Sequence, residues 1–187
     1  MKKILLSGLF IMSIFTITSC TEKDKNNVDT ANVNEDLKDK LVVTVEGVFP
    51  KNDRLQLFYS KDAKFDEKQS LFGMVYGQTV LQKVVFVMPN NIKPQYLRLD
   101  LGENPNQTNV TIKDIQLEYN GLSVEHDPEK LREYFEDTYF TVYNPVTREY
   151  DLRVNDANVF DPILMGSEKL KRSLNSLYNN SNKQTDK

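Results

Sequence analysis

The architecture of this chain is most clearly predicted by two stretches, Tyr96-Leu-Arg-Leu-Asp-Leu101 and Val110-Thr-Ile-Lys-Asp-Ile-Gln-Leu-Glu-Tyr119. In the first, leucines alternate with polar residues, so a strand formed here has one apolar and one polar face. In the second, the alternation changes phase at Lys113-Asp114, which predicts a β-bulge or a bend. Asn120-Gly121 follows directly and is typical of a tight hairpin turn.

The same period-two pattern recurs elsewhere in the chain. Residues 41–46, 54–60 and 84–88 show it, and a further hairpin is expected over 138–154 around Asn144-Pro145. Short strands separated by turn residues are typical of an antiparallel sandwich or barrel. Because long helices do not alternate with the strands, a doubly wound or TIM-barrel plan is not expected. The sequence predicts a mainly β protein, an antiparallel β-sandwich.

One or two short peripheral helices complete this prediction. Asp127 can cap a helix that begins at Pro128, where the missing amide hydrogen of proline is not needed. A second helix is predicted from near Ser167, and residues from Asn179 onward are predicted to form a polar tail. An apolar stripe marks one face of this second helix, at Leu170, Leu174, Leu177 and Tyr178.

Residues 96–119 resemble a segment of galactose-binding-like jelly rolls. In that family, a strand that ends in a polar loop is followed by a strand of the pattern Val-x-Ile-x-x-Ile-x-Leu, as found here from Val110 to Leu117. The resemblance implies a jelly-roll arrangement of the sandwich. It transfers no site residues.

The N-terminus carries the pattern of a secretory signal peptide. Two lysines precede an apolar run over 4–17, which is shorter than the ~20 residues that span a bilayer. The run ends in Ile17-Thr18-Ser19-Cys20, which resembles the lipobox of bacterial lipoproteins and contains the only cysteine of the chain. The resemblance implies that Cys20 is acylated and becomes the first residue of the mature protein. The alternatives are a free thiol or an intermolecular disulfide.

Composition then divides the chain. Residues 21–40 are polar and lack aromatic side chains, so they are predicted to form a disordered tether. Glu22-Lys23-Asp24-Lys25 within them resembles the surface-export signals of Bacteroidota-type lipoproteins, which implies a lipid-anchored envelope protein of the outer membrane on either face. The predicted segments are a signal peptide (1–19), an acylated cysteine with its tether (20–40), a sandwich domain with a C-terminal helix (41–178) and a polar tail (179–187).

The net charge of the mature chain limits the classes of partner that are expected. Removal of the two N-terminal lysines leaves 22 basic and 27 acidic residues, a charge near −5. An acidic surface argues against binding to nucleic acid or to anionic lipid. Membrane attachment is therefore expected to depend on the acyl anchor.

Catalytic motifs are not evident in the sequence. His126 is the single histidine, flanked by acidic residues, and is interpreted as a loop residue. Metalloprotease, nucleophile-elbow and phosphate-loop patterns are missing from the sequence, so neither a metal nor a cofactor is expected. Asp100 and Glu103, at a strand end and in the following loop, are the best-placed candidates for the carboxylate pair that a glycoside hydrolase needs.

A binding site is easier to place. Tyr96, Arg98 and Asp100 share one face of a predicted strand, and Glu103 follows in the next loop. An aromatic ring beside planar polar groups suits a sugar, whose ring stacks while its hydroxyls form hydrogen bonds. The alternative is an ordinary polar sheet face, with Arg98 paired to Asp100.

Three functions stay open at this point. The first is a non-catalytic module that binds carbohydrate. The second is an accessory subunit that docks onto another envelope protein through its short helices and the apolar stripe of the last helix. The third is a small hydrolase that depends on carboxylates.

Overall fold

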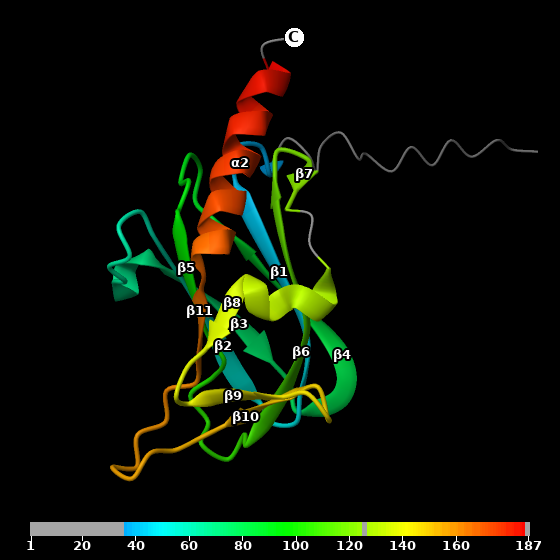
Figure 1. Ribbon diagram of the computed structural model, residues 1–187, viewed down its shortest axis with the longest axis vertical. Helices are drawn as coiled ribbons and strands as arrows, with labels where there is room; N and C mark the ends of the chain where they lie inside the picture. The colour runs from blue at the N-terminus through cyan, green and yellow to red at the C-terminus, as the bar shows by residue number, and fades with distance from the viewer. Residues whose placement is uncertain (1–35, 125–126, 186–187) are drawn as a thin grey trace, which may run out of the picture.

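The computed structural model describes residues 36–124 and 127–185. The predicted signal peptide, Cys20, the tether up to residue 35 and His126 lie outside the described residues. Two antiparallel sheets face each other around one apolar core, with a single long helix, α2, at one end (Figure 1). The prediction of a mainly β, antiparallel sandwich is therefore confirmed.

Both sheets are wholly antiparallel. The first has the order β4 (Gln78–Val87), β1 (Leu41–Phe49), β6 (Asn109–Tyr119), β10 (Glu149–Leu152) and β9 (Thr141–Asn144). The short strand β7 (Leu122–Ser123) pairs with β6. The second has the order β3-β2-β5-β11-β8, with the bounds Ser70–Val75, Asp53–Ser60, Tyr96–Asp100, Ile163–Gly166 and Phe135–Asp137. Most connections pass from one sheet to the other, so the two layers are formed together.

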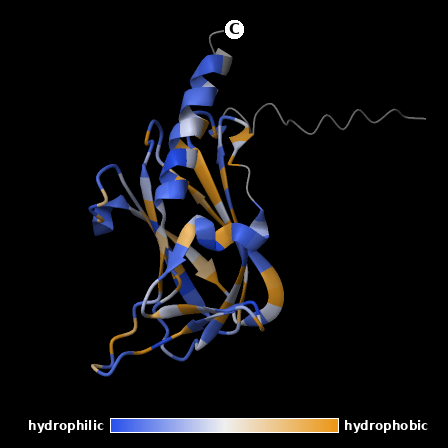
Figure 2. Cartoon of the chain, viewed as in Figure 1, coloured by the Kyte–Doolittle hydropathy of each residue, from blue (hydrophilic) through white to orange (hydrophobic). Residues whose placement is uncertain are grey.

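Alternation places the core as the sequence predicts. In β5, Leu97 and Leu99 are fully buried, whereas the polar residues between them face outward. The bulge in β6 is also confirmed: Glu46 of β1 pairs with Asp114 and the next residue pairs with Ile112, which leaves Lys113 as the extra residue. Figure 2 shows hydrophobic residues concentrated on the strands.

The predicted turns are present. Asn120 and Gly121 have φ values of 49° and 75°, the left-handed conformations that a tight β6–β7 hairpin requires. Strands β9 and β10 form the hairpin expected around Asn144-Pro145. Asp127 caps the 3-10 helix η2, Pro128–Glu133, by accepting a hydrogen bond from the backbone nitrogen of Glu129.

The C-terminal helix corrects two expectations. Helix α2 spans Glu168–Thr185, so the predicted polar tail is helical throughout the part that the structure describes, 179–185. It extends beyond Tyr178 because tertiary contacts continue there: Ser181 is buried and accepts a hydrogen bond from Asn120 at 3.0 Å. The apolar stripe of α2 packs into the core of its own domain and is not available to a partner protein. Its visible face in Figure 2 is largely hydrophilic.

The end of the predicted tether is also ordered. Asp39 donates its backbone N–H to Asn120 Oδ1 at 2.6 Å and accepts from Asn120 Nδ2 at 3.0 Å. Composition alone could not reveal this contact because Asn120 lies in a distant turn. The chain entry and α2 therefore meet at the β6–β7 turn.

Edge strands β3 and β4 extend the sandwich beyond the prediction. Strand β3 was not expected, and β4 begins earlier than residue 84. A Cβ atom at Gly73 would lie 2.1 Å from Val84 Cγ1, so glycine allows the two edge strands to approach closely. A short 3-10 turn, η1, Glu67–Gln69, precedes β3.

Candidate functional site

The outer row, defined as Tyr96, Arg98 and Asp100, lies on the outer face of β5 as predicted. Arg98 donates to both carboxylate oxygens of Asp100, from Nε at 2.7 Å and from Nη2 at 2.6 Å. Its guanidinium also lies 4.8 Å from the ring centroid of Phe58. Burial raises the pKa of Asp100, and the bond from Arg98 opposes this rise. The charged members of the outer row are thus paired with each other.

Tyr96 contacts the C-terminal helix. Its hydroxyl accepts a hydrogen bond from Lys171 Nζ at 2.5 Å, and the same ammonium lies 4.6 Å from the centroid of the ring. Both the hydroxyl and one face of the ring are therefore engaged within the protein. The hydroxyl of Tyr96 therefore already has a partner within the protein.

Glu103 lies beyond the end of β5 and pairs with Arg54 of β2. Its backbone nitrogen donates to Asp53 at 2.8 Å, which fixes the loop. A Cβ atom at Gly102 would lie 2.1 Å from Asp53 Oδ2, and the φ of Gly102 is 137°, so this turn requires glycine. Glu103 and Asp100 are thus held by different arginines.

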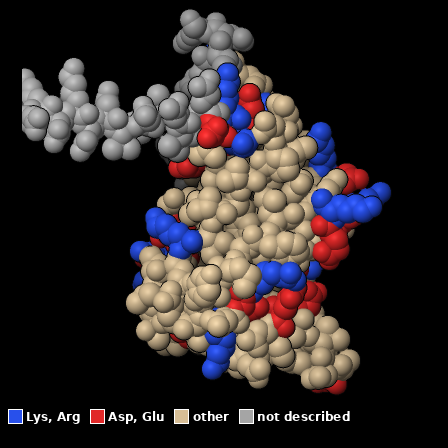
Figure 3. All heavy atoms as spheres, turned by 180° about the vertical axis from the view of Figure 1, so that it is seen from behind, with Lys and Arg blue, Asp and Glu red and all other residues tan. Residues whose placement is uncertain are grey.

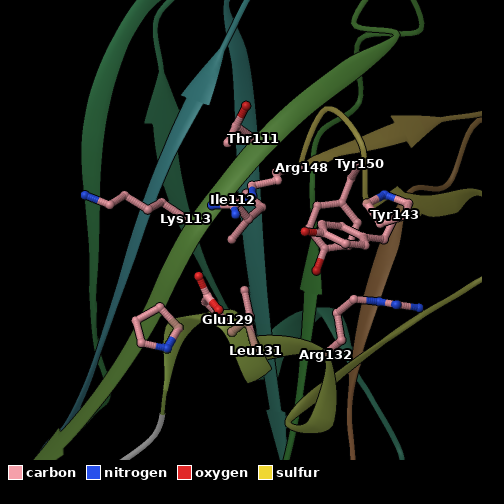
Figure 4. Close-up of a pocket in the computed structure, with 11 residues that line it drawn as sticks. Thr111, Ile112, Lys113, Glu129, Leu131, Arg132, Tyr143, Arg148 and Tyr150 are labelled. Atoms are coloured by element: carbon pink, nitrogen blue, oxygen red, sulfur yellow. The ribbon is translucent and has the colours of Figure 1, made fainter.

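A different region forms a pocket of about 490 Å³ between η2, the bulged part of β6 and the β9–β10 hairpin (Figure 4). We call it the hairpin pocket. Ile112 and Leu131 supply apolar lining, and its remaining small or apolar lining residues are Thr111, Pro128 and Pro145. A volume of this size falls within the usual range for small-molecule sites.

One wall of the hairpin pocket is aromatic and fixed. The rings of Tyr143 and Tyr150 lie 5.2 Å apart, and the guanidinium of Arg132 lies 5.0 Å from the Tyr143 ring. Arg132 donates to both oxygens of Asp137, at 3.1 and 2.9 Å, and Asp137 also accepts from the Tyr143 backbone nitrogen. Burial raises the pKa of Tyr150, so its phenol is protonated at neutral pH. The wall is therefore organised before any ligand binds.

Three further charged side chains line the same pocket: Lys113, Glu129 and Arg148. Within 36–124 and 127–185, none of the three forms an ion pair. Figure 4 shows Glu129 and Leu131 rising from η2, with the two tyrosines on the far side of the pocket. Within the described ranges, these three lining side chains thus carry charges that no ion pair neutralises.

No protein-family model, curated protein or solved structure matches this chain. In the part of the chain that the structure describes, acidic, cysteine and histidine side chains do not form a group of three that could hold a metal. None of the described helices has both the length and the hydrophobicity needed to cross a bilayer.

Sequence reasoning missed the hairpin pocket because its lining comes from three separate segments. The bulge at Lys113, the cap at Asp127 and the Asn144-Pro145 turn were each predicted. What the pattern could not supply was their meeting in space. The one local signal was Arg148, a charged residue just after the Asn144-Pro145 turn. The turn does not require its side chain, and this side chain lines the pocket.

Proposed function

We propose that this chain is a lipid-anchored envelope protein that binds carbohydrate in the hairpin pocket and catalyses no reaction. The observation that supports this most directly is a pocket of about 490 Å³ lined by the partly exposed Tyr143 and by charged side chains that form no ion pair within 36–124 and 127–185. Aromatic faces suit the apolar side of a sugar ring, and charged planar groups form strong hydrogen bonds with its hydroxyls.

The mixture of donors and acceptors also suits a sugar. Each hydroxyl group can donate one hydrogen bond and accept others. Arg148 and Lys113 can only donate, whereas the ionised carboxylate of Glu129 can only accept. A hydroxylated ring can satisfy all three, and a purely apolar ligand can satisfy none.

The non-catalytic part of the proposal rests on the carboxylates. Asp100 is bound by Arg98 and Glu103 by Arg54, so neither is positioned by the other. A hydrolase needs one carboxylic acid and one carboxylate across the same bond. Two separate ion pairs favour a structural role for both residues.

Titration of the full-length chain in detergent with a glycan panel, by calorimetry, tests the binding. Tyr143→Leu should weaken binding at least about tenfold, because stacking on the pocket wall is lost. The matched variant Tyr96→Leu in the outer row should bind as the parent does. Absence of binding to every glycan at about 10 mM would contradict the proposal; loss of binding in Tyr96→Leu alone would return the site to the outer row.

The anchor is tested separately. Acylation at Cys20 would supply about 0.8 kcal/mol for each buried methylene, and several chains hold a protein durably on a membrane. We expect Cys20→Ser to appear in the soluble fraction or as unprocessed precursor. Mass spectrometry that finds an unmodified thiol at the mature N-terminus would contradict the anchor.

Docking onto another envelope protein is the second candidate, and the exposed apolar side chains of β3 and β4 favour it. Met74 of β3 is 58% exposed, Tyr76 in the connection between the two strands is 63% exposed, and the other members are Phe72, Val80 and Leu81. Figure 3, seen from the side opposite to η2, shows a broad area without charged side chains. A group of exposed apolar side chains such as Phe72, Met74 and Leu81 is typical of protein interfaces.

Photocrosslinking tests this candidate. A crosslinking amino acid at Met74 should give a defined adduct with one envelope protein in intact membranes, and the same group at the exposed Asp156 should not. An adduct with a second copy of the chain would indicate self-association, and equal adducts at both positions would contradict a specific docking surface.

A further inference from the structure

We infer that the sugar bound in the hairpin pocket carries an acidic group, a carboxylate above all, and that Arg148 selects it. The inference depends on the proposed function and makes it narrower: it names the class of carbohydrate and the residue that distinguishes it from neutral sugars. Charge, backbone conformation and side-chain chemistry support it independently.

The first argument is the sign of the charge. The whole chain is acidic, with a net charge of −3, yet Lys113, Arg132 and Arg148 line the pocket against a single carboxylate, Glu129. Asp137 neutralises Arg132 through two hydrogen bonds. Among the remaining charged lining residues there are two cations and one anion, so the lining keeps an excess of positive charge, although Lys113 extends away from the two tyrosines (Figure 4). Such a concave site attracts an anion, whereas a neutral sugar gains nothing from the excess.

The second argument is the backbone of Arg148. Its φ is 61°, the left-handed conformation that glycine adopts without strain and other residues adopt at a cost. The turn itself is fixed by backbone atoms and by Asn144: Arg148 N donates to Asn144 O at 2.8 Å, and Val146 N donates to Asn144 Oδ1 at 3.0 Å. The turn therefore does not need the arginine side chain. A strained position with an unneeded side chain that lines a pocket points to a role in binding.

The third argument is the chemistry of the group. A guanidinium presents its N–H groups in a rigid planar fork that matches the two oxygens of a carboxylate. In Arg132 and Arg98 this fork is already filled by Asp137 and Asp100. No carboxylate of the described ranges fills the fork of Arg148, so a ligand carboxylate can take that place.

Calorimetry with uronic acid trisaccharides and the methyl esters of the same trisaccharides tests the inference. The two probe sets share ring shape and hydroxyls and differ in the charged group. The full-length chain should bind at least one of the acids. It should bind the corresponding ester at least about tenfold more weakly. Arg148→Met should weaken binding of the acid about 10- to 100-fold and leave binding of the ester unchanged.

Two variants keep the result unambiguous. Arg172→Met removes the same charge from an exposed position on α2 and should bind the acid as the parent does. Arg148→Gly removes the side chain while it relieves the strained backbone, so weak binding in this variant cannot be attributed to unfolding. Circular dichroism of all three variants should match the parent.

Each other outcome overturns a defined statement. Equal affinity for acid and ester would overturn the inference and leave the proposed function in place. Binding of neither at about 10 mM, with no neutral glycan bound, would overturn both. Equal loss of acid and ester in Arg148→Met would show that this residue contributes contact and does not select charge.

Discussion

The outer row on β5 and the hairpin pocket contain the same kinds of side chains, yet they differ in what those side chains already bind. In the outer row, Arg98 and Asp100 pair with each other and Lys171 engages Tyr96. In the hairpin pocket, Arg132 is paired, but Arg148 and Glu129 form no ion pair within the described ranges. The two regions therefore differ in how far the described residues already pair their charged side chains, and not in their residue types.

The difference has an energetic counterpart. Removal of one partner from the half-buried Arg98–Asp100 pair leaves the other charge without compensation, which destabilises the fold. Removal of an exposed, unpaired charge such as Arg148 costs the fold little. Substitutions in the outer row should thus lower stability, whereas substitutions in the hairpin pocket should lower binding.

Leu99→Ala is expected to have the largest effect. Leu99 is fully buried beneath the outer row, so its truncation should lower the free energy of unfolding by about 2–5 kcal/mol. Urea denaturation measures the loss. The control Leu81→Ala, at a residue that is 43% exposed, should cost far less. Similar losses in the two variants would mean that β5 is not a core strand.

Asp100→Asn tests the outer row directly. It removes the carboxylate that holds Arg98 and should lower the free energy of unfolding by about 1–3 kcal/mol. Sugar binding should not change, because the hairpin pocket is untouched. Asp156→Asn, at an exposed position, serves as the control for charge. Unchanged stability together with lost binding would place the ligand on β5 instead.

Arg148→Gly is expected to act in the opposite sense. Relief of the left-handed backbone at φ 61° should raise the free energy of unfolding by about 0.5–1 kcal/mol. Thermal unfolding of the purified chain measures the gain. A lower Tm than the parent's would indicate that the arginine side chain supports the turn, contrary to the separation of roles.

Asp39→Asn should have the smallest effect, and one that depends on pH. The hydrogen bond from Asn120 lowers the pKa of Asp39, so the folded state favours the carboxylate. Its contribution is present above the unfolded pKa of about 3.9 and is lost as the pH falls through the lower folded value. The variant should lose under about 1 kcal/mol at pH 7 and less near pH 2. An equal loss at both pH values would show that charge is not involved.

Local patterns in the sequence predicted the parts of the fold that depend on neighbours along the chain. Alternation in β5, the extra residue at Lys113, the Asn120-Gly121 turn and the cap at Asp127 were all predictable in this way. Each depends on the pleat, on a backbone conformation or on an unsatisfied amide within a few residues.

Tertiary contacts account for what sequence could not supply. Strand β3 carries Phe72 and Met74 on its exposed face, which hides the usual separation of apolar and polar sides. Helix α2 continues past Tyr178 because Ser181 accepts a hydrogen bond from Asn120, which lies in a turn 61 residues earlier. Likewise, the row at Tyr96 was correctly placed on one face, but its partner Lys171 lies on another element.

The contacts among Asp39, Asn120 and Ser181 make the two ends of the sandwich different. The chain enters at the end of the sandwich where α2 also terminates, whereas the β9–β10 hairpin lies toward the opposite end (Figure 1). If a lipid at Cys20 holds the first end near the bilayer, the second end projects into the surrounding medium. Such a protein could sample polymers beyond the headgroup layer without any hinge or domain rotation.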